Sequence, residues 1–379
     1  MPLKIVIAPD KFKGTLTAAG AAAAIARGCR AGRPDDSLEL MPISDGGEGF
    51  GEVMGRLLGA KLQTVPTVDA AHRPCQASWW WEPKSKTAVI ESAQIIGLAM
   101  LPAGKSHPFD LDTFGLGEVL RVAAAKGARR CLVGLGGSAT NDGGFGLACA
   151  LGWKFFDHAG DLIERWTDLH RLARVGAPRR QRWFNELIVA VDVQNPLLGV
   201  RGATRVYGPQ KGLKPADLAG AEKNLRRLAR VMSREKAGFQ AHPGAGAAGG
   251  LGFGLLTFLG ARTVPGFDLF ARQANLNERL RSVDLVLTGE GRLDASTFMG
   301  KGVGQMAQLC RARKIFCVAL AGDISDRAQV ARKFGQVYAL TDLTSGAKAK
   351  SNPARWLQKL AEQVAVNCAG RQPKACDGK

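Results

Sequence analysis

The sequence predicts an α/β protein with two domains: a three-layer αβα domain made from both termini, and a mixed α/β domain inserted into it. The 379 residues exceed the size at which a single hydrophobic core usually keeps growing. Strand-like and helix-like segments alternate at both ends of the chain, which is typical of a parallel sheet covered by helices. The middle of the chain lacks this regular alternation, so we expect it to fold separately.

The first domain begins with a strand, helix, strand, helix pattern. Apolar runs over 3–8 and 38–43 predict two strands. An alanine-rich segment after Thr15 or Thr17 predicts a helix with a hydroxyl N-cap, and a second helix is expected after Gly49. These four elements open the αβα domain.

The pattern changes near residue 61, where short β-type runs begin to alternate with prolines. A mixed region follows, with a loop-rich part at 157–186. Its expected strands are 77–81, 87–91, 130–135 and 187–193, and its expected helices are 114–126 and 214–237. We place the inserted mixed α/β domain at 61–283.

Regular alternation returns at residue 284 and continues almost to the end of the chain. The expected strands are 284–288, 315–320 and 337–341, and the expected helices are 297–313, 325–334 and 353–367. Because both ends of the chain share this pattern, we assign 1–60 and 284–379 to one discontinuous domain. The polar tail 369–379 is expected to fray.

The chain is strongly basic. Its net charge is +19, from 52 Lys and Arg against 33 Asp and Glu, a balance that can indicate a nucleic-acid partner. The basic residues are spread along the chain, however, and those within 214–237 fall mainly outside its apolar face. We expect a solvated surface and no nucleic acid, and keep a basic nucleic-acid-binding protein as an alternative.

Cysteine usage and hydropathy predict a cytoplasmic protein without a membrane segment. The eight cysteines include no Cys-x-x-Cys pair, as expected of free thiols, and the five histidines form no metal-ligand pattern. The uncharged stretch 244–261 has seven glycines among its eighteen residues, which argues against a transmembrane helix. No secretory leader pattern opens the sequence.

One pattern recurs in both predicted domains: a short apolar run ends in glycines with a charged residue, and a helix-like segment follows. Its copies lie at 4–16, 40–50, 131–146, 187–199 and 284–296. In open α/β sheets, ligands bind outside the carboxyl ends of strands, and glycines there let backbone N–H groups approach an anion. The pattern predicts an enzyme that handles phosphate groups.

The common nucleotide motifs fit poorly. A phosphate-loop match at 104–106 lacks its first glycine, because that position is Ala99. A dinucleotide fingerprint at 244–249 follows a loop instead of a strand. An NAD-linked oxidoreductase of a small hydroxy acid therefore stays an alternative only.

The strongest candidate for phosphate binding is the glycine-rich loop after the strand 130–135. It offers consecutive N–H groups, two hydroxyls, an amide and a carboxylate, whereas a plain capped turn would not need so many glycines. The expected cofactor-binding residues are Gly136, Gly137, Ser138, Ala139, Thr140, Asn141, Asp142 and Gly143.

Three carboxylates are candidates for Mg²⁺ binding or acid–base chemistry. Asp45 and Glu48 follow a strand and could hold Mg²⁺; the alternative is an Asp-Gly turn with Glu48 at a helix N-terminus. Asp192 follows an apolar strand, where burial would favour a general base and Mg²⁺ would favour the ionised form. An Asx turn is the alternative for Asp192.

Cationic side chains accompany the carboxylates. The guanidinium of Arg292 suits a carboxylate or phosphate, with a salt bridge to Glu290 or Asp294 as the alternative. Phosphoryl transfer needs cations around the spreading charge, although single lysines are more often simply solvated. The candidate lysines are Lys11, Lys13, Lys211 and Lys301.

In order along the chain, the motifs APDKFKG, DGGEG, GLGGSATNDGG, VDVQNPLLG with GPQKG, PGAGAAGGLG and TGEGRLDAST resemble those of the type-2 glycerate kinase family. The resemblance implies ATP- and Mg²⁺-dependent phosphorylation of D-glycerate to 2- or 3-phosphoglycerate. It also implies a flavodoxin-like domain interrupted by a second α/β domain, with the active site in the cleft between them. We expect a monomer or a homodimer.

On this resemblance, we hypothesise that Asp192 or Asp45 deprotonates the glycerate hydroxyl, while the other helps to place Mg²⁺ together with Glu48. Lys13 and Lys301 would balance the phosphoryl charge, and the glycine-rich loop would receive the nucleotide phosphates. The expected substrate-binding residues are Arg292, on the glycerate carboxylate, and Asp294, Lys11 and Gly291. The chain departs from the family's usual residues at Lys11, Gln194 and Ser296.

Overall fold

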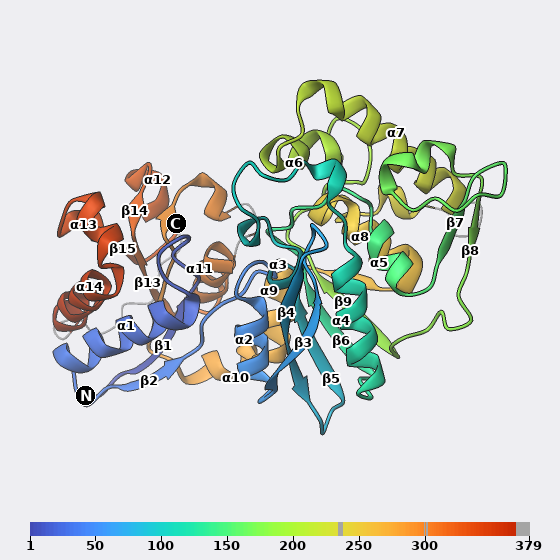
Figure 1. Ribbon diagram of the computed structural model, residues 1–379. Coiled ribbons are helices and arrows are strands. Elements are labelled where there is room, and N and C mark those ends of the chain that lie inside the picture. Colours follow the sequence, from blue (N-terminus) through green and yellow to red (C-terminus); the bar gives the residue numbers. More distant parts are fainter. Residues whose placement is uncertain (234–237, 299, 301, 369–379) are drawn as a thin grey trace. The chain divides into compact units, whose positions relative to one another are not determined.

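The computed structural model describes residues 1–233, 238–298, 300 and 302–368, and the chain divides into two compact units (Figure 1). Unit 1 consists of Met1–Asp45 and Phe267–Lys379, and unit 2 consists of Gly46–Gly266. Each unit contains a β-sheet with parallel strands and packed helices, so the predicted α/β class is confirmed.

Both unit boundaries lie earlier in the sequence than the expected 60/61 and 283/284. The helix α2 (Phe50–Leu57) belongs to unit 2, because Gly51 and Gly55 lie against the indole ring of Trp80 with no room for a Cβ atom. At the other boundary, α10 (Leu276–Arg279) belongs to unit 1, where Arg279 forms an ion pair with Glu39. Tertiary packing, which composition does not reveal, thus sets both positions.

Unit 1 is built on a five-stranded parallel sheet. The strands follow the order β15 (Gln336–Ala339), β13 (Phe316–Ala321), β11 (Leu285–Gly289), β1 (Lys4–Pro9) and β2 (Ser37–Leu40). Counted along the chain, this is the flavodoxin-like order 2-1-3-4-5, in which the winding reverses between the first and third strands. The reversal therefore lies between β1 and β11.

Alternate strand residues in unit 1 pack on two long helices, α1 (Ala18–Gly32) and α14 (Pro353–Cys368). The inward residues of the three central strands are Ile5, Ile7, Leu285, Leu287, Val318 and Leu320. The other helices of this part of the chain are α9 (Gly266–Gln273), α10, α11 (Gly302–Ala312), α12 (Arg327–Ala331) and α13 (Gly346–Ser351). The expected helix 297–313 thus begins later, after a short 3₁₀ turn at Ala295–Phe298.

Unit 2 is built on a six-stranded mixed sheet. The strands follow the order β10 (Arg262–Val264), β9 (Glu186–Ala190), β6 (Arg130–Gly134), β5 (Thr87–Glu91), β4 (Pro74–Glu82) and β3 (Lys61–Val68). The first four are parallel, and β4 and β3 run antiparallel to their neighbours. A separate ribbon pairs β7 (Lys154–Phe156) with β8 (Arg174–Gly176) inside the region expected to be loop-rich.

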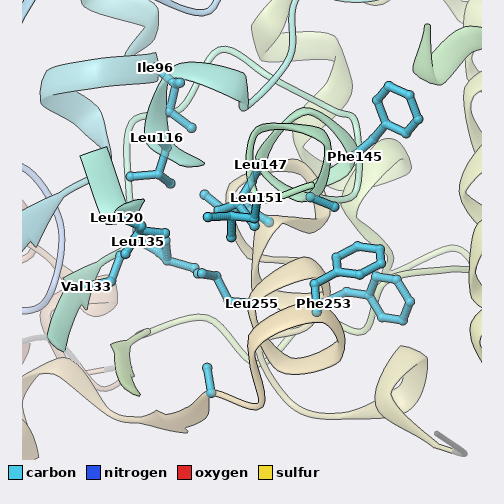
Figure 2. Close-up of a cluster of buried hydrophobic side chains, with 14 of the residues drawn as sticks. Ile96, Leu116, Leu120, Val133, Leu135, Phe145, Leu147, Leu151, Phe253 and Leu255 are labelled. Carbon is cyan, nitrogen blue, oxygen red and sulfur yellow. The ribbon is translucent and has the colours of Figure 1, made fainter. Parts of the chain in front are cut away.

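The core of unit 2 lies between this sheet and its helices. The helices are α2, α3 (Ala93–Ile96), α4 (Phe114–Ala125), α5 (Phe145–Ala150), α6 (Ala203–Lys211), α7 (Pro215–Met232) and α8 (Ala247–Leu259). Figure 2 shows part of this core, with Ile96, Leu116, Leu120, Val133, Leu135, Phe145, Leu147, Leu151, Phe253 and Leu255. Most of the uncharged stretch 244–261 forms α8, whose residues are largely buried in this core. In the described part of the chain, no helix is both long enough and apolar enough to span a membrane.

Candidate active site

At the reversal point of the unit 1 sheet, two carboxylates follow the ends of neighbouring parallel strands. Asp10 follows β1 and Glu290 follows β11, where Pro9 and Gly289 are paired. The Asp10 amide donates to the Gly289 carbonyl oxygen at 2.8 Å, which extends the pairing beyond the strands. Ligands of flavodoxin-like sheets bind at this reversal point, outside the carboxyl ends of the strands.

Asp10 is the buried acid of this site. Its side chain is 7% exposed, and its Oδ1 accepts a hydrogen bond from the Lys11 amide at 2.7 Å. The pKa of Asp10 is raised to about 7, chiefly by burial and then by the charges of Asp45 and Glu290, while the charge and amide of Lys11 oppose the rise. Two further carboxylates therefore lie close enough to Asp10 to affect its charge. Sequence reasoning missed Asp10, although its position directly after a strand was the available signal.

A short strand pair holds the predicted substrate-binding arginine. Arg292 lies on β12 (Arg292–Leu293), which pairs with β14 (Asp323–Ile324), and its side chain is exposed. Its Nε and Nη2 atoms donate to Ser325 Oγ at 2.9 and 2.6 Å. Among the described residues, Arg292 forms no ion pair with Glu290 or Asp294, the alternative that its sequence neighbours suggested.

Hydrogen bonds connect the two acids that flank Arg292. Asp294 Oδ1 accepts from the Ser296 amide at 2.8 Å and from its hydroxyl at 2.6 Å, which forms an Asx turn. The Asp294 amide donates to Thr297 Oγ1 at 3.3 Å, and that hydroxyl donates to Glu290 Oε1 at 2.7 Å. Asp294 therefore shapes the loop through its Oδ1 atom.

Unit 1 also brings the N-terminal lysines to this loop. A Cβ atom on Gly291 would lie 3.1 Å from the backbone nitrogen of Lys13, so the two loops are in close contact. Lys11 is half-buried beside Asp10, and the Lys13 side chain is exposed. Lys301, the other lysine proposed to balance phosphoryl charge, lies outside the described residues.

In unit 2, the glycine-rich loop connects β6 with α5, and most of it is buried. Gly136 and Gly137 are its more accessible residues, while Thr140, Asn141 and Asp142 are 0% exposed. The Ala139 amide donates to the Ile96 carbonyl at 2.8 Å, and the Gly143 amide donates to the Gly249 carbonyl at 3.1 Å. The accessible part of the loop is therefore its beginning, at Gly136 and Gly137.

The carboxylate of Asp142 points into the protein. Its two oxygens accept hydrogen bonds from the amide and hydroxyl of Thr113 and from the amides of Gly144 and Gly146, at 2.7–3.2 Å. The pKa of Asp142 is raised to about 6, chiefly by burial and then by the charge of Asp112, while the hydrogen bonds from Gly146 and Thr113 oppose the rise. Asp142 therefore maintains the shape of the loop from inside.

The glycines of the DGGEG motif lie against this loop. A Cβ atom on Gly136 would lie 2.8 Å from the Cα atom of Gly47, and one on Gly46 would lie 2.9 Å from the Cβ atom of Ala190. The exposed residue Glu48 is thus placed next to the beginning of the glycine-rich loop, at the carboxyl ends of β6 and β9. Asp45 is the last residue of unit 1, and Glu48 belongs to unit 2.

Another carboxylate, missed by sequence reasoning, holds the start of α2. Glu91 ends β5, is 1% exposed, and accepts from the amides of Gly49 and Gly51 at 3.1 and 3.0 Å. A carboxylate in this position is stabilised by the helix N-terminus. This is the role that the alternative interpretation gave to Glu48, and it depends on a pairing of distant residues that sequence does not reveal.

Asp192 follows β9 at the same edge of the unit 2 sheet. Its Oδ1 accepts a hydrogen bond from the Gly266 amide at 2.9 Å, and Gly266 is distant in sequence. The adjoining Asn195 instead holds local structure, since its amide donates to the Arg201 carbonyl at 2.7 Å and its oxygen accepts from the Tyr207 hydroxyl at 2.7 Å. The Gly266 amide therefore orients one oxygen of the Asp192 carboxylate.

The carboxylates of this chain suit Mg²⁺, which needs few protein ligands, better than a metal ion whose ligands all come from the protein. In the described part of the chain, no group of three or more His, Cys, Asp and Glu residues could hold a metal ion. Mg²⁺ is usually bound by one or two carboxylates together with water and substrate phosphates. The pKa of Asp10 is raised mainly by burial and in addition by the charge of Asp45, and a divalent cation would relieve the repulsion between these two carboxylates.

Comparison with known proteins gives one consistent result. The sequence model of the glycerate kinase family matches residues 5–369. A glycerate kinase of Halalkalibacterium halodurans is 36% identical over 96% of this chain and 97% of its own. A glycerate 2-kinase of Escherichia coli is 36% identical over 90% of this chain and 91% of its own. The crystal structure of a Salmonella typhimurium LT2 protein assigned as glycerate kinase 2 superposes with a TM-score of 0.83 at 32% identity, covering 97% of this chain and 98% of that one.

Proposed function

This chain belongs to the glycerate kinase family, and from that premise we propose that it transfers the γ-phosphoryl group of ATP to a hydroxyl group of D-glycerate, with Mg²⁺ as its cofactor. The observation that supports this most directly is the group of acids at the reversal point of the unit 1 sheet, where Asp10 is buried beside Asp45 and Glu290. Phosphoryl transfer needs little covalent chemistry from the protein, but it does need charges placed around the phosphate.

Glycerate binding is assigned to unit 1. The exposed guanidinium of Arg292 would hold the glycerate carboxylate, because its planar fork matches the two carboxylate oxygens. Asp294 and Gly291 shape the loop around it, and Lys11 and Lys13 add positive charge from the neighbouring loop. Lys301 is proposed for the same role from its sequence context.

Mg²⁺ and proton transfer are assigned to the carboxylates. From their sequence context, Asp45 and Glu48 are the proposed protein ligands of the metal ion, with water and substrate phosphates as its other ligands. When bound, Mg²⁺ would neutralise charge that develops on the phosphoryl oxygens. Asp192 is then the acceptor for the glycerate hydroxyl proton, since Gly266 orients one of its oxygens.

Nucleotide binding is assigned to the beginning of the glycine-rich loop. Gly136 and Gly137 are accessible and carry no side chains, so backbone N–H groups can approach the phosphates. Gly137 has φ +62°, a conformation that glycine adopts without strain. The buried part of the loop, from Ala139 to Gly143, would keep this surface in shape.

We further propose that the product is 2-phosphoglycerate, following the name of the Escherichia coli relative, and that the enzyme acts in the cytoplasm. Among the cysteines described by the structure, Cys75, Cys131, Cys149 and Cys310 are free thiols. Free thiols suit a reducing compartment.

The experiment is an assay of ADP release by the purified full-length chain with Mg-ATP and a panel of small hydroxy acids. We expect turnover with D-glycerate and little with L-glycerate, lactate or glycolate. Turnover with another acid of the panel, and none with D-glycerate, would reject the substrate and keep the reaction class. Thermal stabilisation by NADH but not by Mg-ATP would favour the oxidoreductase alternative instead, and salt-sensitive retention on DNA without turnover would favour the nucleic-acid binder.

A further inference from the structure

A buried lysine in unit 2 contacts the glycine-rich loop from behind. Lys211 is the last residue of α6 and is 7% exposed. Its Nζ atom donates to Ser138 Oγ at 2.9 Å and to the Thr140 carbonyl oxygen at 2.7 Å. Both acceptors are neutral, so neither one compensates the ammonium charge directly. Burying an ammonium group costs desolvation free energy. If this position served packing alone, an apolar residue would be more stable there.

Both ends of the helix α6 form hydrogen bonds with the glycine-rich loop. In its first turn, Thr204 is fully buried and its Oγ1 accepts a hydrogen bond from Asn141 Nδ2 at 3.1 Å. Lys211 makes its two bonds in the last turn, about 10 Å further along the helix axis. The cation also lies at the helix C-terminus, where the helix dipole favours positive charge. Three residues of the loop, at 138, 140 and 141, are thus fixed by one helix.

The start of α8 confines the same carbonyl group from another direction. Gly249 has φ +71°, and a Cβ atom on it would lie 1.9 Å from the Thr140 oxygen. The Gly249 carbonyl accepts from the Gly143 amide at 3.1 Å. Only a glycine allows this approach, so the motif around Gly249 supports the loop and does not itself form a dinucleotide fingerprint. Thr140 is therefore enclosed, and Lys211 is the side chain that donates to its carbonyl oxygen.

The charge of Lys211 depends on pH near neutrality. Burial lowers the pKa of Lys211 to about 7, and the negative charge of Asp142 opposes this change. Asp142 is itself influenced by Asp112. The charged group that faces Lys211 is thus a carboxylate of the same loop.

We propose that Lys211 is the positioning residue of the nucleotide site: it fixes Ser138 and Thr140 so that the accessible glycines before them present their N–H groups to the nucleotide phosphates, and it places a positive charge behind them. This inference rests on the proposed function of the loop. Lys211 acts through the loop without touching the nucleotide, so its loss changes ATP affinity and leaves glycerate affinity in place.

The test compares Lys211→Met, which removes the donors and the charge, with Lys211→Gln, which keeps a donor. Lys223→Met, on the exposed face of α7, is the matched control. With the full-length enzyme, we expect the KM for ATP to rise about tenfold or more in Lys211→Met, because hydrogen bonds from a charged group are lost. The rise should be smaller in Lys211→Gln, and the KM for D-glycerate should stay within about twofold in all variants.

A pH profile separates positioning by charge from a purely structural role. The KM for ATP of the wild type, divided by that of Lys211→Gln, should rise as pH increases from about 6 to about 8.5, because the wild type alone loses the Lys211 charge. A flat ratio, an unchanged KM for ATP in Lys211→Met, or a rise in the glycerate KM instead would overturn the proposal. If Lys211→Met does not fold, the comparison of Lys211→Gln with the wild type decides.

A binding measurement tests the role of Lys211 even if the chain is not a glycerate kinase. If the wild type does not phosphorylate glycerate, Mg-ADP binding is measured by calorimetry on the same proteins. Weaker Mg-ADP binding in Lys211→Met than in Lys223→Met would still support the positioning role. Equal binding in the two variants would reject it.

Discussion

The guanidinium of Arg292 donates from both Nε and Nη2 to a single hydroxyl oxygen, Ser325 Oγ, at 2.9 and 2.6 Å. A hydroxyl carries no charge, so the cation is oriented without being neutralised. The pairing of β12 with β14 fixes the two residues relative to each other, since Arg292 is in register with Asp323. An oriented, exposed arginine of this kind suits a carboxylate ligand.

Replacing Arg292 by methionine should raise the KM for D-glycerate by about 10- to 100-fold, because a charge-assisted hydrogen bond contributes about 1.5–3 kcal/mol. The KM for ATP should change little. Arg311→Met, at an exposed position of α11, is the control and should behave as the wild type. Steady-state kinetics with both substrates measure the effect, and an unchanged glycerate KM would remove Arg292 from the substrate site.

Asp192→Asn tests the proposed proton acceptor. The variant keeps an oxygen that can accept from the Gly266 amide, so we expect it to fold. Its kcat should fall by about 100- to 10,000-fold, the usual contribution of a general base, with little change in the KM for ATP. Asp35→Asn, at an exposed position, serves as the control. Turnover close to that of the wild type would show that another group accepts the proton.

Strand ends were the most predictable part of this protein. The apolar runs before Asp10, Gly136, Asp192 and Glu290 are strands in the structure, and all four residues follow carboxyl ends of parallel strands. Apolar periodicity and glycine positions suffice for this, because both are local properties of the chain. The flavodoxin-like order of unit 1 follows from the same alternation, together with the resemblance to a known family.

Long-range contacts were not predictable. The helix α6 was missed because Gly208 and Pro209 interrupt its pattern, and Lys211 accordingly looked like one more solvated lysine. Glu91 gave no local signal, since its partners Gly49 and Gly51 lie about 40 residues earlier. The burial of Asp142 and the extent to which the glycine-rich loop is enclosed likewise depend on α4, α6 and α8, which come from different parts of the chain.

The contact between α1 and α14 gives a stability prediction for unit 1. A Cβ atom on Gly28 would lie 2.2 Å from the Gln358 carbonyl oxygen, so Gly28→Ala forces the helices apart. We expect a loss of about 1–3 kcal/mol in the free energy of unfolding, as for other overpacked cores. The matched change Gly220→Ala, in α7, meets no atom within 4 Å and should add about 0.5–1 kcal/mol through helix propensity. Urea denaturation measures both, and equal effects would contradict the packing account.

The pH dependence of stability follows from Asp142 and Lys211. The pKa of Asp142 is raised from 3.8 to about 6. The stability that Asp142 contributes to the folded protein is therefore complete below pH 3.8 and is lost as pH rises through about 6. The pKa of Lys211 is lowered from 10.5 to about 7, so its contribution is full above pH 10.5 and is lost as pH falls towards about 7. Between about pH 7 and pH 10.5, the free energy of unfolding should therefore rise with pH because of Lys211.

This is measured as the difference in unfolding free energy between the wild type and Lys211→Met. From about pH 8 to about pH 10, Asp142 is ionised in both the folded and the unfolded state, so Lys211 alone should change the difference. We expect the wild type to gain up to about 1.4 kcal/mol per pH unit relative to the variant. A constant difference over this range would mean that the Lys211 pKa is not lowered in the folded protein.

The most direct measurement of the central proposal is a phosphorus NMR spectrum of the full-length chain incubated with Mg-ATP and D-glycerate. The account predicts that the γ-phosphate signal of ATP disappears and a phosphomonoester signal appears, split into a doublet by the single proton on C2 of glycerate. A triplet would place the phosphate on C3 and contradict the 2-phosphoglycerate assignment. A spectrum with ATP unchanged, or with inorganic phosphate as the only new species, would contradict the proposal that this chain phosphorylates glycerate.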